Sequence, residues 1–172
     1  MFKKIIIFFC ASLLLLGVAG CTDNDGKKTD NNETDGNVKC SEILEEILTE
    51  ATGTHTDKKL FYDDEKYEEY FEYLYNTSVK RVSDGAFAYA SSAYADEITV
   101  LYAEDADDVD TIVKHLEDRI SNRIQDFNGY KPEEVAKLEN AVIKTSGNYI
   151  IMAVSDEADT IIEIFEKIVG GK

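Results

Sequence analysis

The sequence contains no tryptophan, a single proline and few cationic residues. Lysine and arginine total 18 against 35 acidic residues, and the formal net charge is −17 at pH 7. Nucleic-acid binding depends on cationic side chains that neutralise phosphates, and adhesion to anionic lipid headgroups depends on the same charges. We therefore expect no nucleic-acid partner, and we interpret the acidic surface as a solvated one. The missing tryptophan weakens any hypothesis of a site that stacks sugars.

Histidine is also too scarce for the common metal and catalytic sites. His55 lies in a polar stretch, and His115 lies away from the apolar side of its expected helix. Neither has a cysteine or a second histidine at the spacing of zinc ligands. The sequence also lacks a GxSxG turn, a phosphate-binding glycine loop and a dinucleotide fingerprint. We therefore predict no metal and no cofactor and favour a non-enzymatic role, while a Ser–His–Asp triad built from distant residues stays open.

No apolar run is long enough to cross a bilayer, which takes about 20 residues. The longest run, residues 5–20, follows a short basic start and is the layout of a secretory signal. Residues 18–20, Val-Ala-Gly directly before Cys21, resemble the lipobox of bacterial lipoproteins. The resemblance implies that a diacylglyceryl group is attached to the thiol of Cys21 and that the chain is cut between Gly20 and Cys21. Two acyl chains are enough for stable attachment to a membrane.

The lipobox suggests three parts of the chain. Residues 1–20 are the expected signal peptide, residues 21–40 the lipidated cysteine with a flexible acidic linker, and residues 41–172 a single domain. Loss of the signal removes two lysines and no acid, which changes the formal charge from −17 to −19. The linker has one sizeable apolar side chain, Val38, and so cannot offset the entropy of ordering. We expect the domain at the outer face of the cytoplasmic membrane, held there through Cys21.

Cys40 is the thiol that remains when Cys10 is removed with the signal and Cys21 carries lipid. A single thiol cannot form an internal disulfide. A helix start and a neighbouring Lys39 are features that lower the pKa of a thiol. Because Cys40 lies at the edge of the expected linker, we interpret it as a residue without a catalytic role.

Hydrophobic periodicity predicts an α+β fold. Helices are expected at residues 42–52 (capped by Ser41), 63–75, 105–127, 132–140 and 156–169, and strands at residues 86–92, 97–103, 141–145 and 149–154. Residues 86–127 and 141–169 thus share the order strand, strand, helix. We predict a four-stranded antiparallel sheet built from two ββα halves with both helices on one face. The additional N-terminal helices then cover the other face or one edge.

Two acidic clusters look like cation sites. The first opens the helix near residue 105: Asp105, Asp107, Asp108 and Asp110. Capping of free N–H groups and the helix dipole explain these carboxylates without a metal. The second has the spacing of an EF-hand loop: Asn31, Glu33, Asp35, Gly36 and Glu42. Its first position is asparagine, its ninth is Lys39 and no helix precedes it, so we expect no calcium there.

Aromatic residues are concentrated between residues 61 and 75. Tyr67, Tyr70, Phe71 and Tyr75 fall on one helical stripe and are explained by packing. Tyr62 and Tyr73 lie off that stripe, and exposed tyrosines are enriched at binding surfaces. These two are the candidate binding face. The leading hypothesis is a monomeric, non-catalytic module that binds an unknown protein or small ligand, and the alternative is an extracytoplasmic hydrolase with an unrecognised site.

The second half of the chain carries a family resemblance. Arg119 with the later run Tyr130-x-Pro132-Glu133-Glu134, and Gly147-Asn148-Tyr149 before an apolar strand, resemble a family of small lipoproteins from Firmicutes. That family is catalogued as domain of unknown function 4358. The resemblance implies the extracytoplasmic compartment and the extent of the domain, and it implies no activity.

Overall fold

The computed structural model describes residues 38–91 and 93–170. The cleavage site at Gly20, the lipid site at Cys21 and the EF-hand-like positions 31–36 lie outside the described residues. Within the described part of the chain, no helix is both long and apolar enough to cross a membrane.

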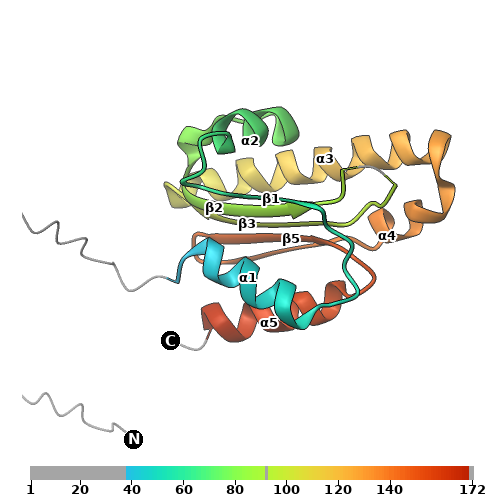
Figure 1. Cartoon of the computed structure of the whole chain (residues 1–172). Coiled ribbons are helices and arrows are strands. Elements are labelled where there is room, and N and C mark those ends of the chain that lie inside the picture. Colours follow the sequence, from blue (N-terminus) through green and yellow to red (C-terminus); the bar gives the residue numbers. More distant parts are fainter. Residues whose placement is uncertain (1–37, 92, 171–172) are drawn as a thin grey trace, which may run out of the picture. The chain divides into compact units, whose positions relative to one another are not determined.

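An antiparallel sheet of five strands lies between two layers of helices (Figure 1). The strand order is β1-β2-β3-β5-β4. The strands are β1 (Lys58–Phe61), β2 (Val82–Tyr89), β3 (Glu97–Ala103), β4 (Val142–Ser146) and β5 (Tyr149–Val154). The helices are α1 (Cys40–Glu50), α2 (Tyr67–Tyr75), α3 (Val109–Tyr130), α4 (Val135–Glu139) and α5 (Ala158–Gly170). Short 3-10 turns lie at Val79–Arg81, Ala106–Asp108 and Pro132–Glu134.

The predicted α+β class with an antiparallel sheet is confirmed, but the predicted count of four strands is wrong. The additional strand, β1, pairs with β2 from Lys58 opposite Tyr89 to Phe61 opposite Ala86. Its sequence, KKLF, looks polar because two lysines stand on a four-residue edge strand. Lysines are common on such edges, where they discourage pairing with other chains.

The expected arrangement of the two halves is also wrong. The order strand, strand, helix does occur twice, as β2-β3-α3 and β4-β5-α5. However, α3 packs on one face of the sheet and α5 on the other. The central strands explain why, because every residue of β5 is buried and β3 is buried on both faces as far as Leu101. Each face therefore needs its own helical layer.

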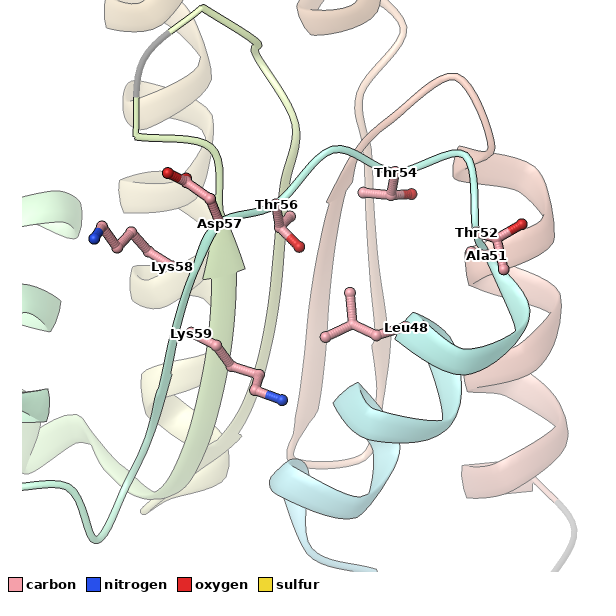
Figure 2. A pocket seen from close by; sticks show the side chains of 8 residues that line it. All are labelled: Leu48, Ala51, Thr52, Thr54, Thr56, Asp57, Lys58 and Lys59. Carbon is pink, nitrogen blue, oxygen red and sulfur yellow. The ribbon is translucent and has the colours of Figure 1, made fainter.

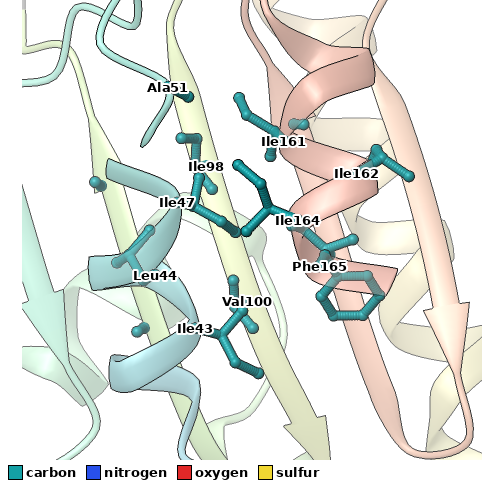
Figure 3. Close-up of a cluster of buried hydrophobic side chains, with 14 of the residues drawn as sticks. Ile43, Leu44, Ile47, Ala51, Ile98, Val100, Ile161, Ile162, Ile164 and Phe165 are labelled. Atoms are coloured by element: carbon teal, nitrogen blue, oxygen red, sulfur yellow. The ribbon is translucent and has the colours of Figure 1, made fainter. Parts of the chain in front are cut away.

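The first core lies between the sheet and the helices α1 and α5 (Figure 3). Ile43 and Ile47 of α1 and Ile161 and Phe165 of α5 are fully buried there. They pack on the side chains that the central strands direct to this face: Ala86, Ala88, Ile98, Val100, Ile151 and Ala153. Small residues in β2 and large ones in β3 allow α1 and α5 to lie side by side over the sheet.

The second core fills the opposite face, under α2, α3 and α4. Tyr67, Phe71 and Tyr75 of α2 are buried there, as their helical spacing predicted. Leu116 of α3 and Leu138 of α4 complete the layer. The aromatic rings of α2 contact one another and Phe87 of β2, with centroid separations of 5.3–5.7 Å.

Helix ends depend on tertiary contacts more than the sequence indicated. Helix α1 begins at Cys40, not after a Ser41 cap, and the N–H of Cys40 donates to the carboxylate of Asp84 in β2 at 2.8 Å. Neither Asp105 nor Asp108 makes a side-chain cap, so the predicted capping role is wrong for these two residues. Asp108 instead forms an ion pair with Arg81. Pro132 does open its turn of helix, as predicted.

Candidate functional site

Three connections meet at one end of the sheet, and we call this region the loop end. It consists of residues 51–57 after α1, residues 90–91 and 93–96 between β2 and β3, and residues 155–157 before α5, together with α4. Polar contacts tie the connections together. The Thr54 and Ser155 hydroxyls lie 2.8 Å apart, and the N–H of Gly53 donates to Glu157 at 2.6 Å.

The loop end is hollowed by three cavities of about 490, 350 and 260 Å³. Figure 2 shows the largest, which lies between the end of α1 and strand β1. It is lined by Leu48, Ala51, Thr52, Thr54, Thr56, Asp57, Lys58 and Lys59. Hydroxyls, both charge signs and a small apolar floor are present, which suits a polar ligand of modest size.

Tyr94 is the aromatic centre of the loop end. His55 stacks on its ring with a centroid separation of 4.4 Å, and the Nζ atom of Lys131 lies 4.5 Å from the ring centroid. The side chain remains 41% exposed and lines the cavity of about 260 Å³ together with His55 and Asp57. An exposed tyrosine held by a cation and a stacked ring is a rigid, amphipathic contact surface.

Asp57 is already committed to hydrogen bonds. Ser91 donates to it twice, from the backbone N–H at 2.7 Å and from the hydroxyl at 2.5 Å. These bonds lower the pKa of Asp57 and keep it ionised. In the described part of the chain no hydrogen bond joins His55 to Asp57 or Ser91. The three side chains therefore do not form the relay of a Ser–His–Asp triad.

Beneath Tyr94, a buried lysine lies among carboxylates. Lys137 Nζ is 2.7 Å from Asp96, 3.3 Å from Glu134 and 3.6 Å from Asp156. Burial lowers the pKa of Lys137, but the hydrogen bonds and charges of Asp96 and Glu134 outweigh it and raise the pKa overall. Glu134 also accepts the N–H of Ala95 at 2.9 Å. This network holds the start of β3 against α4.

A second buried network lies one residue further along β3. Glu97 is fully buried and pairs with Arg119 at 2.9 Å and with Arg123 at 2.7 Å. The hydroxyl of Tyr75 also donates to it at 3.1 Å. Arg123 donates in addition to the carbonyl of Ala95. These contacts satisfy the buried charges internally, so the network positions the 90–96 loop and leaves no free group for catalysis.

The structure separates the two tyrosines that the sequence singled out. Tyr73 is 83% exposed on α2. Tyr62 is half-buried, with its ring 5.4 Å from that of Tyr67 and its hydroxyl 3.3 Å from the carbonyl of Val82. No direct contact between Tyr62 and Tyr73 is present in the described residues. Both lie on the face of the sheet that α2 covers, away from the cavities of the loop end.

The remaining residues considered from sequence do not form a site either. Cys40 is fully buried rather than placed in a linker, and burial beside Asp84 raises the pKa of its thiol. His115 is half-buried on α3. Within residues 38–91 and 93–170, no three histidine, cysteine, aspartate or glutamate side chains are grouped so as to hold a metal ion.

A family model described as Domain of unknown function (DUF4358) matches residues 61–155, more than half of the chain. The chain belongs to the DUF4358 family. No match was found among curated proteins or among solved structures. The matched range of the DUF4358 family begins at the last residue of β1 and ends just after β5. It includes Tyr94 and both buried charge networks except Asp156, and it excludes His55, Asp57 and helices α1 and α5.

Sequence reasoning missed the loop end as a whole. Lys137 is 41 residues from Asp96 along the chain, and only the fold brings it to the loop that carries Tyr94 and Asp96. One signal was available, because Asp96 and Glu97 stand directly at the start of an apolar strand. Two adjacent acids in a position that becomes buried require cationic partners, which the network supplies.

Proposed function

We propose that this chain is an extracytoplasmic lipoprotein, anchored to the membrane through Cys21, whose domain is a non-catalytic binding module. The expected location is the outer face of the cytoplasmic membrane. We infer that the loop end is the principal binding face and that Tyr94 is its central contact. The binding partner that fits the cavities is a polar ligand or a polar segment of another envelope protein.

The observation that carries this proposal is the position of the loop end relative to the start of the domain. Val38, where the described chain begins, accepts a hydrogen bond from Tyr149 at 2.6 Å. Tyr149 stands at the start of β5, opposite Tyr102 near the end of β3. The loop end lies at the other end of these strands (Figure 1), about 17 Å away at the rise of an extended strand. A chain attached through Cys21 therefore leads to the end of the domain opposite these three cavities, where a smaller cavity of about 210 Å³ lies beside Val38 and Tyr149.

The state of the polar groups supports binding over catalysis. Asp57 is ionised and doubly hydrogen-bonded, and Lys137 is held as an ammonium by its acidic neighbours. A general acid or base works best with a pKa near the operating pH. The pKa of Asp57 is lowered and that of Lys137 is raised, so both shifts lead away from neutral pH. Tyr94, in contrast, is exposed and rigidly supported, as expected of a binding contact.

Site-specific photo-cross-linking in intact cells tests the binding face. A photoreactive amino acid placed at Tyr94 should give a discrete adduct, while the same residue at Glu163, exposed on α5, should not. Placement at Tyr73 and at Tyr62 tests the other candidate surface. An adduct from Tyr73 alone would move the binding face to α2. The absence of any adduct above the Glu163 background at all three tyrosines would contradict the binding module.

The alternative function is hydrolysis at the cavity that Tyr94 lines. Its support is the presence of His55, Asp57 and Ser91 within one loop cluster. A serine-directed phosphonate probe should then label Ser91, and substitution of Ser91 by alanine should remove the label. We favour binding because His55 stacks on Tyr94 and makes no hydrogen bond to Ser91 in the described part of the chain. The group that accepts the hydrogen bond of the Ser91 hydroxyl is Asp57, and its lowered pKa makes it a weak base.

A further inference from the structure

The lysine beneath the loop end stands in an unusual environment for an ion pair. The side chains of Lys137 and Asp96 are 7% and 1% exposed, and Nζ lies 2.7 Å from Oδ2. Oδ1 of Asp96 is buried and has no hydrogen-bond partner. Oε2 of Glu134 lies 3.3 Å from the same Nζ atom. The Lys137 nitrogen thus lies within hydrogen-bond reach of two carboxyl groups, each of which can carry a proton.

The other lysine–carboxylate pairs in residues 38–91 and 93–170 lack this combination. Lys131 lies 3.6 Å from Glu134, and 24% of the Lys131 side chain is exposed. Lys144 and Glu166 lie 2.9 Å apart, but both side chains are about half exposed. Lys59 and Glu45 lie 2.6 Å apart and are also open to solvent. Exposed pairs of this kind contribute little and exchange freely with water. Lys137 is distinguished by burial, by a carboxylate with one unsatisfied oxygen and by a second acid next to the nitrogen.

We propose that Lys137 and Asp96 become joined by an intramolecular isopeptide bond, with Glu134 as the proton carrier. The inference concerns a modification site and does not depend on the binding function proposed above. The bond would link the residue directly before β3 to α4 and so fix the loop that carries Tyr94.

The reaction is a condensation that releases one water molecule. Proton transfer within the Lys137–Asp96 hydrogen bond converts the ion pair into an amine and a carboxylic acid. The lone pair of Nζ then attacks Cγ of Asp96, and a new N–C bond forms. Glu134 accepts one proton from the nitrogen and delivers it to the departing hydroxyl of Asp96, which leaves as water when the C–O bond breaks. Glu134 ends as the carboxylate it was, and no oxidant or reductant is needed.

Two physical factors favour the condensation. The fold holds the reacting groups in place, and effective molarities for well-oriented groups reach about 10⁵–10⁸ M, which exceeds the concentration of competing water. The bond also replaces two buried charges, which are costly to desolvate, by a neutral amide. The neighbouring carboxylates act in the other direction, because they raise the pKa of Lys137 and make the amine a minor form. The bond is therefore expected to form slowly after folding.

Peptide mass spectrometry of the full chain, purified from membranes, decides the proposal. Trypsin should yield a branched product in which peptide 82–114 is joined to peptide 124–144, one water molecule lighter than their sum, with no cleavage after Lys137. Recovery of Lys137 only at the end of linear peptide 124–137, from fresh protein and from protein incubated folded for days, would overturn the proposal. A branch to Asp156, or a dehydrated linear peptide linking Lys137 to Glu134, would overturn the assignment to Asp96.

Variants test the role of each group. Lys137→Arg keeps the positive charge but cannot form the bond, so the branched product should be absent. Glu134→Gln keeps a hydrogen-bond acceptor but cannot carry a proton, and it should slow the appearance of the branched product about 10²-fold or more. Cooperative thermal unfolding of Glu134→Gln shows whether it is folded, and bond formation at the wild-type rate would overturn the role of Glu134. The internal control is Lys144, which should form no branch to Glu166.

Discussion

The hydroxyl oxygen of Tyr67 occupies the space in which a side chain at Gly85 would begin. A Cβ atom built on Gly85 would lie 1.9 Å from that oxygen and 3.0 Å from a methyl carbon of Leu101. Helix α2 thus approaches strand β2 as closely as it does because residue 85 has no side chain. The Tyr67 hydroxyl is buried there without a hydrogen-bond partner.

We predict that Gly85→Ala lowers the free energy of unfolding by about 1–3 kcal/mol, as overpacking of a core does. Tyr67→Phe removes the clashing atom and an unsatisfied hydroxyl, so it should be nearly neutral alone and should partly rescue Gly85→Ala. Urea unfolding of the double-mutant cycle measures the coupling. Gly129→Ala is the matched control, since a Cβ there meets nothing within 4 Å. Strictly additive effects of Gly85→Ala and Tyr67→Phe would refute the contact.

Helix α2 offers neighbouring aromatic residues with opposite environments. Phe71 is fully buried, and its replacement by alanine should cost about 3–5 kcal/mol. Tyr73→Ala should stay within about 0.5 kcal/mol, because the ring is exposed. Tyr62→Ala should fall between them, since its half-buried ring packs on Tyr67. Chemical denaturation of the three variants checks this order, and a large loss from Tyr73→Ala would place its ring in the core.

The buried charge network around Glu97 should contribute strongly to cooperative stability. Glu97→Ala leaves Arg119 and Arg123 without their carboxylate, and breaking a buried pair in this way costs about 3–5 kcal/mol. Glu45→Ala breaks the exposed pair with Lys59 and should cost about 1 kcal/mol or less. Thermal unfolding of both variants at low and high salt separates the two cases. Equal effects would mean that Glu97 is screened by solvent.

Cys40 should make the domain less stable in alkali. Burial and the nearby Asp84 raise the pKa of its thiol well above the ordinary value of 9.0. A group with a raised folded pKa contributes stability below its unfolded pKa and loses that contribution as pH rises further. Denaturation between about pH 8 and pH 10 should show a steeper loss for the wild type than for Cys40→Ala. Thiol-specific labelling of Cys40 in the folded domain at neutral pH would contradict its burial.

Membrane attachment should depend on Cys21. The thiol of Cys21 is the proposed acceptor of the lipid, so Cys21→Ser should abolish both lipidation and cleavage of the signal. In detergent phase partitioning the wild type should enter the detergent phase, and the variant should not yield the acylated, cleaved form. Cys10→Ser is the matched control and should behave as the wild type. Normal processing and membrane retention of Cys21→Ser would sink the lipoprotein proposal.

The parts of the fold that could be read from the sequence are those set by local periodicity. The long helix α3, the stripe of α2 and the hairpin of β4 and β5 follow from regular apolar spacing and from Gly147, whose φ of +57° suits a tight turn. Strand β1 was missed because its pairing with β2, and not the pattern of its own four residues, makes it a strand. Polar edge strands carry too little local signal to be distinguished from a loop.

The membrane hypothesis depends on the sequence alone, since residues 1–20 and Cys21 carry it without tertiary structure. Which face each helix covers, and which charges meet, was decided only by the tertiary structure. Both faces of β3 and β5 are buried, so α3 and α5 had to separate, although their similar sequence context suggested one shared face. Lys137 meets Tyr94 and Asp96 because the fold brings α4 to this end of the sheet, and long-range proximity of this kind leaves no periodic trace along a chain. Local spacing encodes helices and turns, whereas sites built from distant residues arise from how the layers pack.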